Sequence, residues 1–212
     1  MLRRLFGRSE DLAPPTLPVV RNLTIGRSLR VDPLAWRRLG SEARFALDSD
    51  TLEITAQGLV DLGADGFVHR FYTDDDLMFQ VVSADREGTR AEDHTLFMPW
   101  SSAWPPNPAA RRVWLDRMRA PTFSVEGLGD YRRFWFSPDD ELQDPVGFWE
   151  SVYDDRAGTT ARRIYQTSML FARVLPGNGS ELLLAIEVEP SGGDVTHEVM
   201  IGIPLNVAEF QA

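Results

Sequence analysis

The sequence predicts a single β-rich α+β domain in which antiparallel sheets dominate and helices are few and short. Segments rich in β-branched and aromatic residues recur between turn-forming residues, which is typical of strands. No strand–helix unit repeats along the chain, so a parallel α/β sheet is not expected. The 212 residues are 43% hydrophobic and 10% aromatic, a composition that can fill a packed core.

Residues 1–18 are predicted to form a flexible N-terminal segment, and residues 19–212 the folded domain. The stretch LAPPTLP at residues 12–18 contains three prolines, which favour an extended linker. The preceding MLRRLFGR could form one basic amphipathic turn. A frayed terminus is favoured over a weak peripheral membrane contact through residues 1–8, because so short a segment binds weakly alone.

The strand and helix signals then follow one another along the chain. Strands are expected at 23–31, 51–62, 67–72, 77–84, 95–98, 122–128, 131–136, 164–175, 181–190 and 196–205. The last two flank a glycine-rich hairpin connection, SGGD at residues 191–194. Helices are expected only at 33–39, where Pro33 suits a first turn, and at 108–118, where the apolar spacing is helical.

Two segments of the chain echo each other in sequence. ITAQGLVDLG followed by HRFYTDDD, within residues 54–76, parallels FSVEGLGDY followed by RRFWFSPDD, within residues 123–140. A true repeat would give the domain two pseudo-repeated hairpin units, each ending in an acidic turn. A chance match is the alternative, because the matched stretches are short and separated by a gap.

Composition excludes several classes of chemistry. All 22 basic residues are arginine and there is no cysteine. A Walker-type phosphate loop, a Schiff-base enzyme and a Ser-Lys hydrolase need lysine, whereas thiol catalysis, zinc–thiolate sites, iron–sulfur clusters and disulfides need cysteine. The formal net charge of −10 argues against a nucleic-acid partner. We therefore expect no cofactor.

The sequence also lacks the features of a membrane-spanning or exported chain. No stretch approaches the roughly 20 apolar residues that span a bilayer, and the N-terminus has no secretory signal pattern. A cytoplasmic location without a transmembrane segment is expected.

Candidate catalytic residues gather in VDLGADGFVHRFYTDDD, residues 60–76. They are Asp61, His69, Asp74, Asp75 and Asp76. Strand alternation places His69 and Arg70 on opposite faces, so the two side chains cannot converge unless a bulge intervenes. Three consecutive aspartates lack the alternate spacing of a cation-binding loop, which favours an Asx turn, and no metal site is expected.

The aromatic segment FMPWSSAWPP, residues 97–106, supplies a candidate partner-binding surface. Trp100 and Trp104 lie beside prolines in a predicted loop, and flat rings give a large contact area at low entropic cost. Together with Asp74 and Asp75 they are the predicted partner-binding residues. Packing in the core is the alternative role for the two tryptophans.

GLVDLGADGFVHRFYTDDD, together with LTIGRSLRVDP before it and GDYRRFWF after it, resembles the YjfK family, a bacterial family of uncharacterised function. The resemblance extends from about Pro18 to the C-terminus. Members tend to be encoded beside a PspA-like protein, a membrane-remodelling coiled-coil protein of envelope-stress responses. The resemblance therefore implies an accessory role, and it brings no catalytic residues with it.

Two hypotheses of different classes follow, with the non-enzymatic one favoured. The first is a cytoplasmic adaptor that binds a protein partner, of the PspA-like kind, through the aromatic segment and the acidic turns. The second is a metal-dependent or carboxylate-based hydrolase that uses the Asp61, His69 and Asp74–Asp76 region. Convergence of those groups in a pocket would favour the enzyme, and exposed tryptophans beside a solvated turn would favour the adaptor.

Overall fold

The computed structural model describes residues 17–137, 141–177 and 179–212. Most of the predicted N-terminal segment, including the basic turn at residues 1–8, lies outside the described residues. Asp139 and Asp140, which end the second copy of the sequence echo, also lie outside them. Neither α-helix of the described part is long and apolar enough to cross a membrane.

Strands are the main secondary structure of the described part of the chain, and helices are few. The strands are β1 (Ser28–Val31), β2 (Thr51–Asp61), β3 (Phe67–Thr73), β4 (Met78–Ser83), β5 (Ala91–Ala103), β6 (Thr122–Val125), β7 (Gly129–Arg133), β8 (Val146–Tyr153), β9 (Ala161–Val174), β10 (Ser180–Pro190), β11 (Thr196–Pro204) and β12 (Phe210–Gln211). The α-helices are α1 (Leu34–Arg37) and α2 (Pro108–Arg119), and short 3₁₀ turns are found at Gly63–Asp65 and Val207–Glu209.

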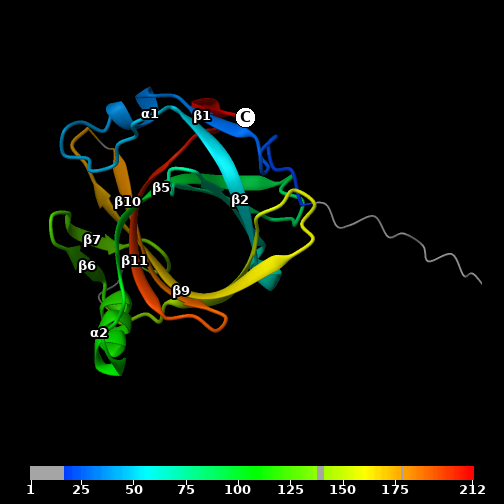
Figure 1. Cartoon of the computed structure of the whole chain (residues 1–212). Helices are drawn as coiled ribbons and strands as arrows, with labels where there is room; N and C mark the ends of the chain where they lie inside the picture. The colour runs from blue at the N-terminus through cyan, green and yellow to red at the C-terminus, as the bar shows by residue number, and fades with distance from the viewer. Residues whose placement is uncertain (1–16, 138–140, 178) are drawn as a thin grey trace, which may run out of the picture.

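Eight of these strands close into an antiparallel β-barrel, which Figure 1 shows in a view along its axis. The strand order around the barrel is β2-β3-β4-β5-β11-β10-β9-β8, and β8 pairs with β2 to complete the ring. Closure leaves none of these eight strands as a free edge along its whole length, which removes the usual site of edge-to-edge association.

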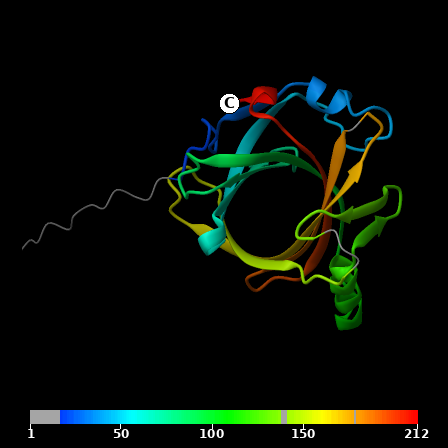
Figure 2. The ribbon, with the colours of Figure 1, turned by 180° about the vertical axis from the view of Figure 1, so that it is seen from behind.

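The barrel is built from two four-stranded meanders. One contains β2 to β5, the other β8 to β11, and each runs through consecutive hairpins. The first strands of the two meanders pair with each other, as do the last strands, so the two seams are β2–β8 and β5–β11. Because β5 and β8 run in the same direction, the connection through α2, β6 and β7 returns along the outside of the barrel (Figures 1 and 2).

The α+β prediction is wrong in its architecture, because the antiparallel sheet closes into a barrel with outer strands around it. The two echoing segments also have different places in the fold. The first forms β2 and β3, which are barrel strands, and the second forms the short β6–β7 hairpin outside the barrel. The structural counterpart of β2–β3 is β8–β9, which the echo did not identify.

Two hydrophobic clusters lie on opposite sides of the barrel wall. The larger cluster packs the outer face against β1, α1, α2 and the β6–β7 hairpin, with Phe71, Phe79 and Phe171 as large buried members. The smaller cluster fills part of the barrel interior and consists of Met78, Phe97, Leu170, Leu182, Leu184, Ile186 and Met200. Trp135 packs against both clusters. The interior is therefore only partly filled by apolar side chains.

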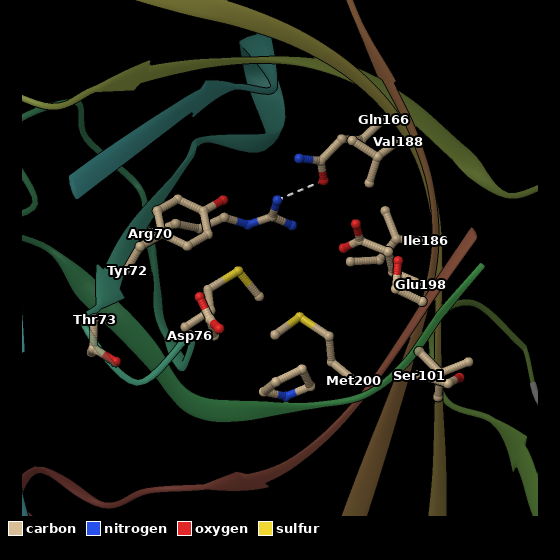
Figure 3. A pocket seen from close by; sticks show the side chains of 14 residues that line it. Arg70, Tyr72, Thr73, Asp76, Ser101, Gln166, Ile186, Val188, Glu198 and Met200 are labelled. Atoms are coloured by element: carbon tan, nitrogen blue, oxygen red, sulfur yellow. Dashed lines mark hydrogen bonds between the residues drawn. The ribbon is translucent and has the colours of Figure 1, made fainter. Parts of the chain in front are cut away.

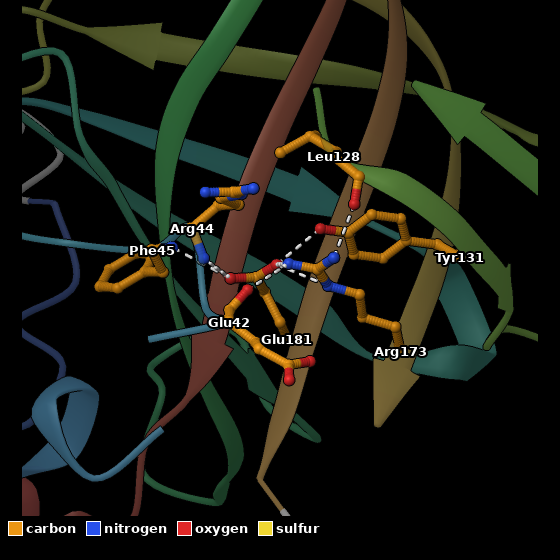
Figure 4. Close-up of polar contacts among 7 residues, drawn as sticks. All are labelled: Glu42, Arg44, Phe45, Leu128, Tyr131, Arg173 and Glu181. Atoms are coloured by element: carbon orange, nitrogen blue, oxygen red, sulfur yellow. Dashed lines mark hydrogen bonds and ion pairs between the residues drawn. The ribbon is translucent and has the colours of Figure 1, made fainter. Parts of the chain in front are cut away.

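A buried carboxylate fastens the outer layer to the barrel (Figure 4). Glu181 of β10 accepts hydrogen bonds from the main-chain N–H groups of Arg44 (2.6 Å) and Phe45 (3.0 Å) and from the Tyr131 hydroxyl (2.6 Å). Arg173 forms an ion pair with the same carboxylate at 2.6 Å and also donates to the Leu128 carbonyl. With these partners Glu181 joins a loop, a hairpin and two barrel strands.

Candidate ligand-binding cavity

The barrel interior contains a cavity of about 420 Å³ (Figure 3). Its apolar walls come from residues of β4, β5, β10 and β11, namely Met78, Pro99, Ile186, Val188, Val199 and Met200. Its polar lining comprises Arg70, Tyr72, Thr73, Asp76, Ser101, Ser102, Gln166 and Glu198. An eight-stranded barrel is just wide enough either to be filled by side chains or to hold one small ligand.

The cavity reaches one end of the barrel. Asp76 in the β3–β4 turn, and Ser101 and Ser102 near the end of β5, are exposed and line it there. Beyond the cavity, toward the other end, the interior is filled by Phe97, Leu170 and their apolar neighbours. The β3–β4 turn and the end of β5 therefore form a mouth of the cavity.

Arg70 is the centre of a buried polar network next to the cavity. Its guanidinium donates to the Glu150 carboxylate at 2.9 Å, to the Gln166 side-chain oxygen at 2.7 Å and to the Gln80 side-chain oxygen at 3.1 Å. The Tyr72 hydroxyl also donates to Glu150, at 2.7 Å. The Arg70 and Glu150 side chains are 2% and 0% exposed, so their charges are compensated by each other and not by water.

The network shifts the proton affinities of its members. Burial alone would lower the pKa of Arg70, but the adjacent Glu150 carboxylate outweighs burial and raises it. Burial, followed by the nearby Glu150 charge, raises the pKa of Tyr72 well above its usual value. Arg70 is thus held as a cation and Tyr72 as a neutral hydrogen-bond donor.

Gly58 makes room for this network. A β-carbon at Gly58 would lie 1.8 Å from Glu150 Oε1, which no real pair of atoms allows. Gly58 pairs with Arg70 on β3 and with Val152 on β8, so the glycine lies where three barrel strands surround the carboxylate. A glycine inside a strand often marks such a close approach.

A β-bulge shapes the wall at the mouth. Met200 of β11 pairs with Pro99, and the preceding Val199 pairs with Ser101, so Trp100 is the extra residue on β5. Proline is tolerated inside a sheet at bulges because it has no N–H to give to the ladder. The bulge re-aims the strand, which lets Pro99, Ser101 and Ser102 all line the cavity.

Glu198 is the second carboxylate of the interior and, unlike Glu150, has no cation paired with it. Its one hydrogen bond among the described residues is accepted from Thr196 Oγ1 at 3.2 Å. No ion pair within 4.0 Å joins it to Arg70 in the described structure, although Figure 3 shows both side chains pointing into the cavity. Burial raises the pKa of Glu198, and the charge of Arg70 opposes this only in part.

The structure separates the predicted catalytic residues. Asp61 is exposed at the end of β2 away from the mouth, where it accepts from the Gly63 N–H at 2.8 Å. His69 is fully buried on the outer face of the barrel, and neither ring nitrogen has a hydrogen-bond partner among the described residues. Burial lowers the pKa of His69 and keeps it neutral. As the alternation of β3 predicted, His69 and Arg70 face opposite sides of the strand.

The three consecutive aspartates form the β3–β4 turn. All three are exposed, and Asp76 adopts the left-handed conformation with φ 59°. The turn is closed by hydrogen bonds from the Asp76 N–H to the Thr73 carbonyl and from the Leu77 N–H to the Thr73 hydroxyl. Asp76 lines the cavity, so one of the predicted residues does belong to its mouth.

The two candidate partner-binding tryptophans lie near the same end of the barrel. Trp100 is 38% exposed at the β5 bulge, and Trp104 is 72% exposed just after β5 ends. The segment predicted as a loop is therefore strand as far as Ala103. No group of three or more metal-ligating side chains occurs among the described residues.

Sequence reasoning missed Gln166 and Glu198 as cavity residues, and it did not place Glu150 in the adjoining network. Two signals could have indicated them. An acid in the middle of FWESV and a glutamine in YQTSM each interrupt apolar runs, at positions that share a strand face with buried residues. A third signal was Gly58, because a glycine inside a long strand often marks a place where other atoms approach the backbone closely.

Comparison with known proteins yields one match. A family model described as "Protein of unknown function (DUF2491)" matches residues 1–211. No curated protein and no solved structure matches the chain. The match agrees with a family of unknown function, whereas no named relative supports the YjfK name.

Proposed function

The chain belongs to the DUF2491 family, whose function is unknown, and we propose from its geometry that the protein binds a small amphipathic molecule inside the barrel. The observation that carries this proposal is the cavity of about 420 Å³, which has apolar walls and a few convergent polar groups. Ligand sites of proteins have this character and span roughly 300–1,000 Å³.

The barrel wall supports the same proposal. Arg70, Gln166 and Tyr72 are held by hydrogen bonds within the protein, so their positions do not depend on a ligand. A site that is formed before binding loses little conformational entropy on binding. The candidates for catalysis do not converge there, which favours binding over hydrolysis.

Titration with the uncharged apolar dye N-phenyl-1-naphthylamine tests the proposal. The dye fluoresces strongly in a dry apolar site, and we expect saturable enhancement with the wild-type protein. Val188→Phe should reduce the affinity for the dye at least tenfold, because the phenylalanine ring is larger than the valine side chain and occupies the cavity. Val174→Phe is the matched control, since Val174 is 78% exposed and does not line the cavity.

Absence of saturable enhancement in a stably folded wild-type protein would contradict the proposal. So would equal dye binding by the Val188→Phe and Val174→Phe variants. Thermal melts of both variants separate loss of binding from loss of the fold, because overpacking a core can itself cost about 1–3 kcal/mol.

We propose a second candidate function, the binding of a protein partner through Trp100 and Trp104, with a PspA-like protein as the partner that the family resemblance implies. The exposed fractions of the two rings, 38% and 72%, support it, because tryptophan is enriched among the residues that dominate interface energies. Asp74 and Asp75 are exposed in the turn at the same end of the barrel and would affect encounter with a charged partner.

Binding kinetics with a purified PspA-like protein tests this candidate. Trp100→Ala with Trp104→Ala should weaken binding about thirtyfold, mainly through faster dissociation. Asparagine at Asp74, Asp75 and Asp76 should slow association instead. Trp149→Ala, at a tryptophan that is 45% exposed elsewhere on the barrel, is the control. Unchanged binding by the folded double variant would exclude this surface.

A further inference from the structure

The polar groups of the cavity limit the chemistry of the ligand's polar end, an inference that rests on the proposed binding function. The positive charge of Arg70 is already balanced by Glu150, with which it forms a buried ion pair at 2.9 Å. A ligand anion at Arg70 would therefore add an uncompensated negative charge close to Glu150. Glu198 inside the cavity and Asp76 at its mouth are further carboxyl groups that an anion would meet.

Two charged groups inside the cavity, Arg70 and Glu198, keep hydrogen-bonding capacity that their partners among the described residues do not use. Arg70 donates to protein partners through Nε and Nη1, and no hydrogen bond among the described residues uses its Nη2. Glu198 accepts only from Thr196. In Figure 3 the guanidinium of Arg70 and the carboxyl group of Glu198 point into the cavity from different walls, with no bond drawn between them.

These two groups call for a ligand with one acceptor and one donor. A carboxylate offers acceptors only, so it could use Arg70 but would be repelled by Glu198. An alkylammonium offers donors only, so it could use Glu198 but would leave the Arg70 N–H group unpaired. A buried polar group left without a partner is costly, which is why such sites discriminate strongly.

We propose that the polar end of the ligand is an uncharged amide-type group, such as a primary carboxamide, a ureido group or a lactam. Its carbonyl oxygen accepts from Arg70 Nη2, and its N–H donates to the Glu198 carboxylate. The apolar remainder of the ligand packs against Met78, Ile186, Val188 and Met200, which form the walls. The ligand then brings hydrogen bonds but no net charge to a site where the Arg70 cation is already balanced by Glu150.

Competition between three matched probes tests the proposal. Octanamide, octanoate and octylamine each have eight carbon atoms in an unbranched chain and differ in the polar end. Each is titrated against bound N-phenyl-1-naphthylamine at pH 8, where Glu198 is expected to be ionised. Octanamide should displace the dye at a concentration at least about tenfold lower than either charged probe, which corresponds to about 1.4 kcal/mol.

Glu198→Gln provides the decisive variant, because glutamine is close in shape to glutamate but carries no charge and can donate. In this variant the preference for octanamide over octanoate should fall at least about fivefold, since the repulsion of the carboxylate is removed. Glu53→Gln is the matched control, because Glu53 is exposed and does not line the cavity, and the probe preference of this variant should stay that of the wild type.

The outcomes distinguish this inference from the function on which it rests. Suppose that the dye binds the wild type and not Val188→Phe, but that octanoate or octylamine displaces it best, or that no probe displaces it. That result would overturn the amide proposal and leave the binding function standing. A preference unaffected by Glu198→Gln would overturn it as well. Failure of the dye to bind wild-type protein would overturn both.

Discussion

At the scale of single residues, Glu150 is the buried carboxylate on which the polar network of the barrel interior converges. It is fully buried and accepts hydrogen bonds from Arg70, Gln166 and Tyr72. Burying both charges of an ion pair is costly, so the pair itself need not stabilise the fold. Removing one partner is different, because the other charge is then buried without compensation.

We therefore expect Glu150→Gln to lower the free energy of unfolding by about 3–5 kcal/mol. Asp154→Asn, which removes an ion pair with Arg162 in which both side chains are more than 60% exposed, should cost less than about 1 kcal/mol. Urea denaturation of the two variants measures the difference. Similar losses in both would show that the interior network contributes no more than a surface pair.

Glu198 gives the stability a dependence on pH whose sign follows from its environment. Burial raises its pKa above the ordinary 4.5, so the folded state holds this proton more strongly than the unfolded state does. Ionisation of Glu198 then reduces stability as pH rises through and above that value. Arg70 from β3 and Asp76 from the β3–β4 turn are the charged groups that line the same cavity.

Glu198→Gln should accordingly melt at a higher temperature than the wild type at pH 7. The difference should shrink as the pH falls below about 4.5, where the carboxyl is protonated in both states. Melts of both proteins between pH 4 and pH 8 give the test, with Glu53→Gln beside them. A difference that is constant across this range would contradict the assigned protonation behaviour.

At the scale of secondary-structure elements, sequence patterns predicted most of the strands and both α-helices. The expected helices at 33–39 and 108–118 are α1 and α2, and every expected strand range overlaps an observed strand. The strands that were missed are β8, which closes the ring, and the two-residue β12. The inward face of β8 carries the charged Glu150 and its outward face carries the aromatic Trp149. The order of polar and apolar residues along β8 therefore does not show which face is buried.

The cavity could be predicted less well than the strands. Alternation correctly separated Arg70 from His69, but it cannot show which face of a strand becomes the inside of a barrel. That depends on pairings between β2 and β8 and between β5 and β11, which join residues far apart in the sequence. The partners of Arg70 on β8 and β9 follow from those pairings alone.

The outer elements depend on Glu181 for their attachment, which makes a prediction about local stability. In Glu181→Gln, Arg173 loses its ion-pair partner. The glutamine side chain has one oxygen that accepts hydrogen bonds, where the glutamate has two. We expect faster hydrogen exchange of the amides of Arg44 and Phe45, whose N–H groups this carboxylate accepts. Exchange in β3 and β4 serves as the internal control and should change much less.

At the scale of the whole molecule, the two meanders depend on each other. Each supplies half of the barrel wall, and the cavity is lined from both: Arg70 comes from the first meander, and Gln166 and Glu198 come from the second. Neither half encloses an interior without the other. Residues 19–212 were predicted to form one domain, and this shared interior is the reason to expect it to unfold as one.

Thermal unfolding should therefore be a single transition, with the same midpoint by far-ultraviolet and near-ultraviolet circular dichroism. The tryptophans report tertiary packing, and the strands report secondary structure. Two separated transitions, or a near-ultraviolet signal lost well before the far-ultraviolet signal, would contradict a single cooperative domain.

The seam between β5 and β11 has a consequence for how the protein is made. During synthesis the first meander emerges with β2 and β5 as its outer strands, and the edge of β5 that faces away from β4 has no partner until residues 196–204 have been added. Open strand edges invite pairing with other chains, and contacts between distant residues form slowly. The nascent chain is thus most vulnerable to aggregation in the interval before its last long strand leaves the ribosome.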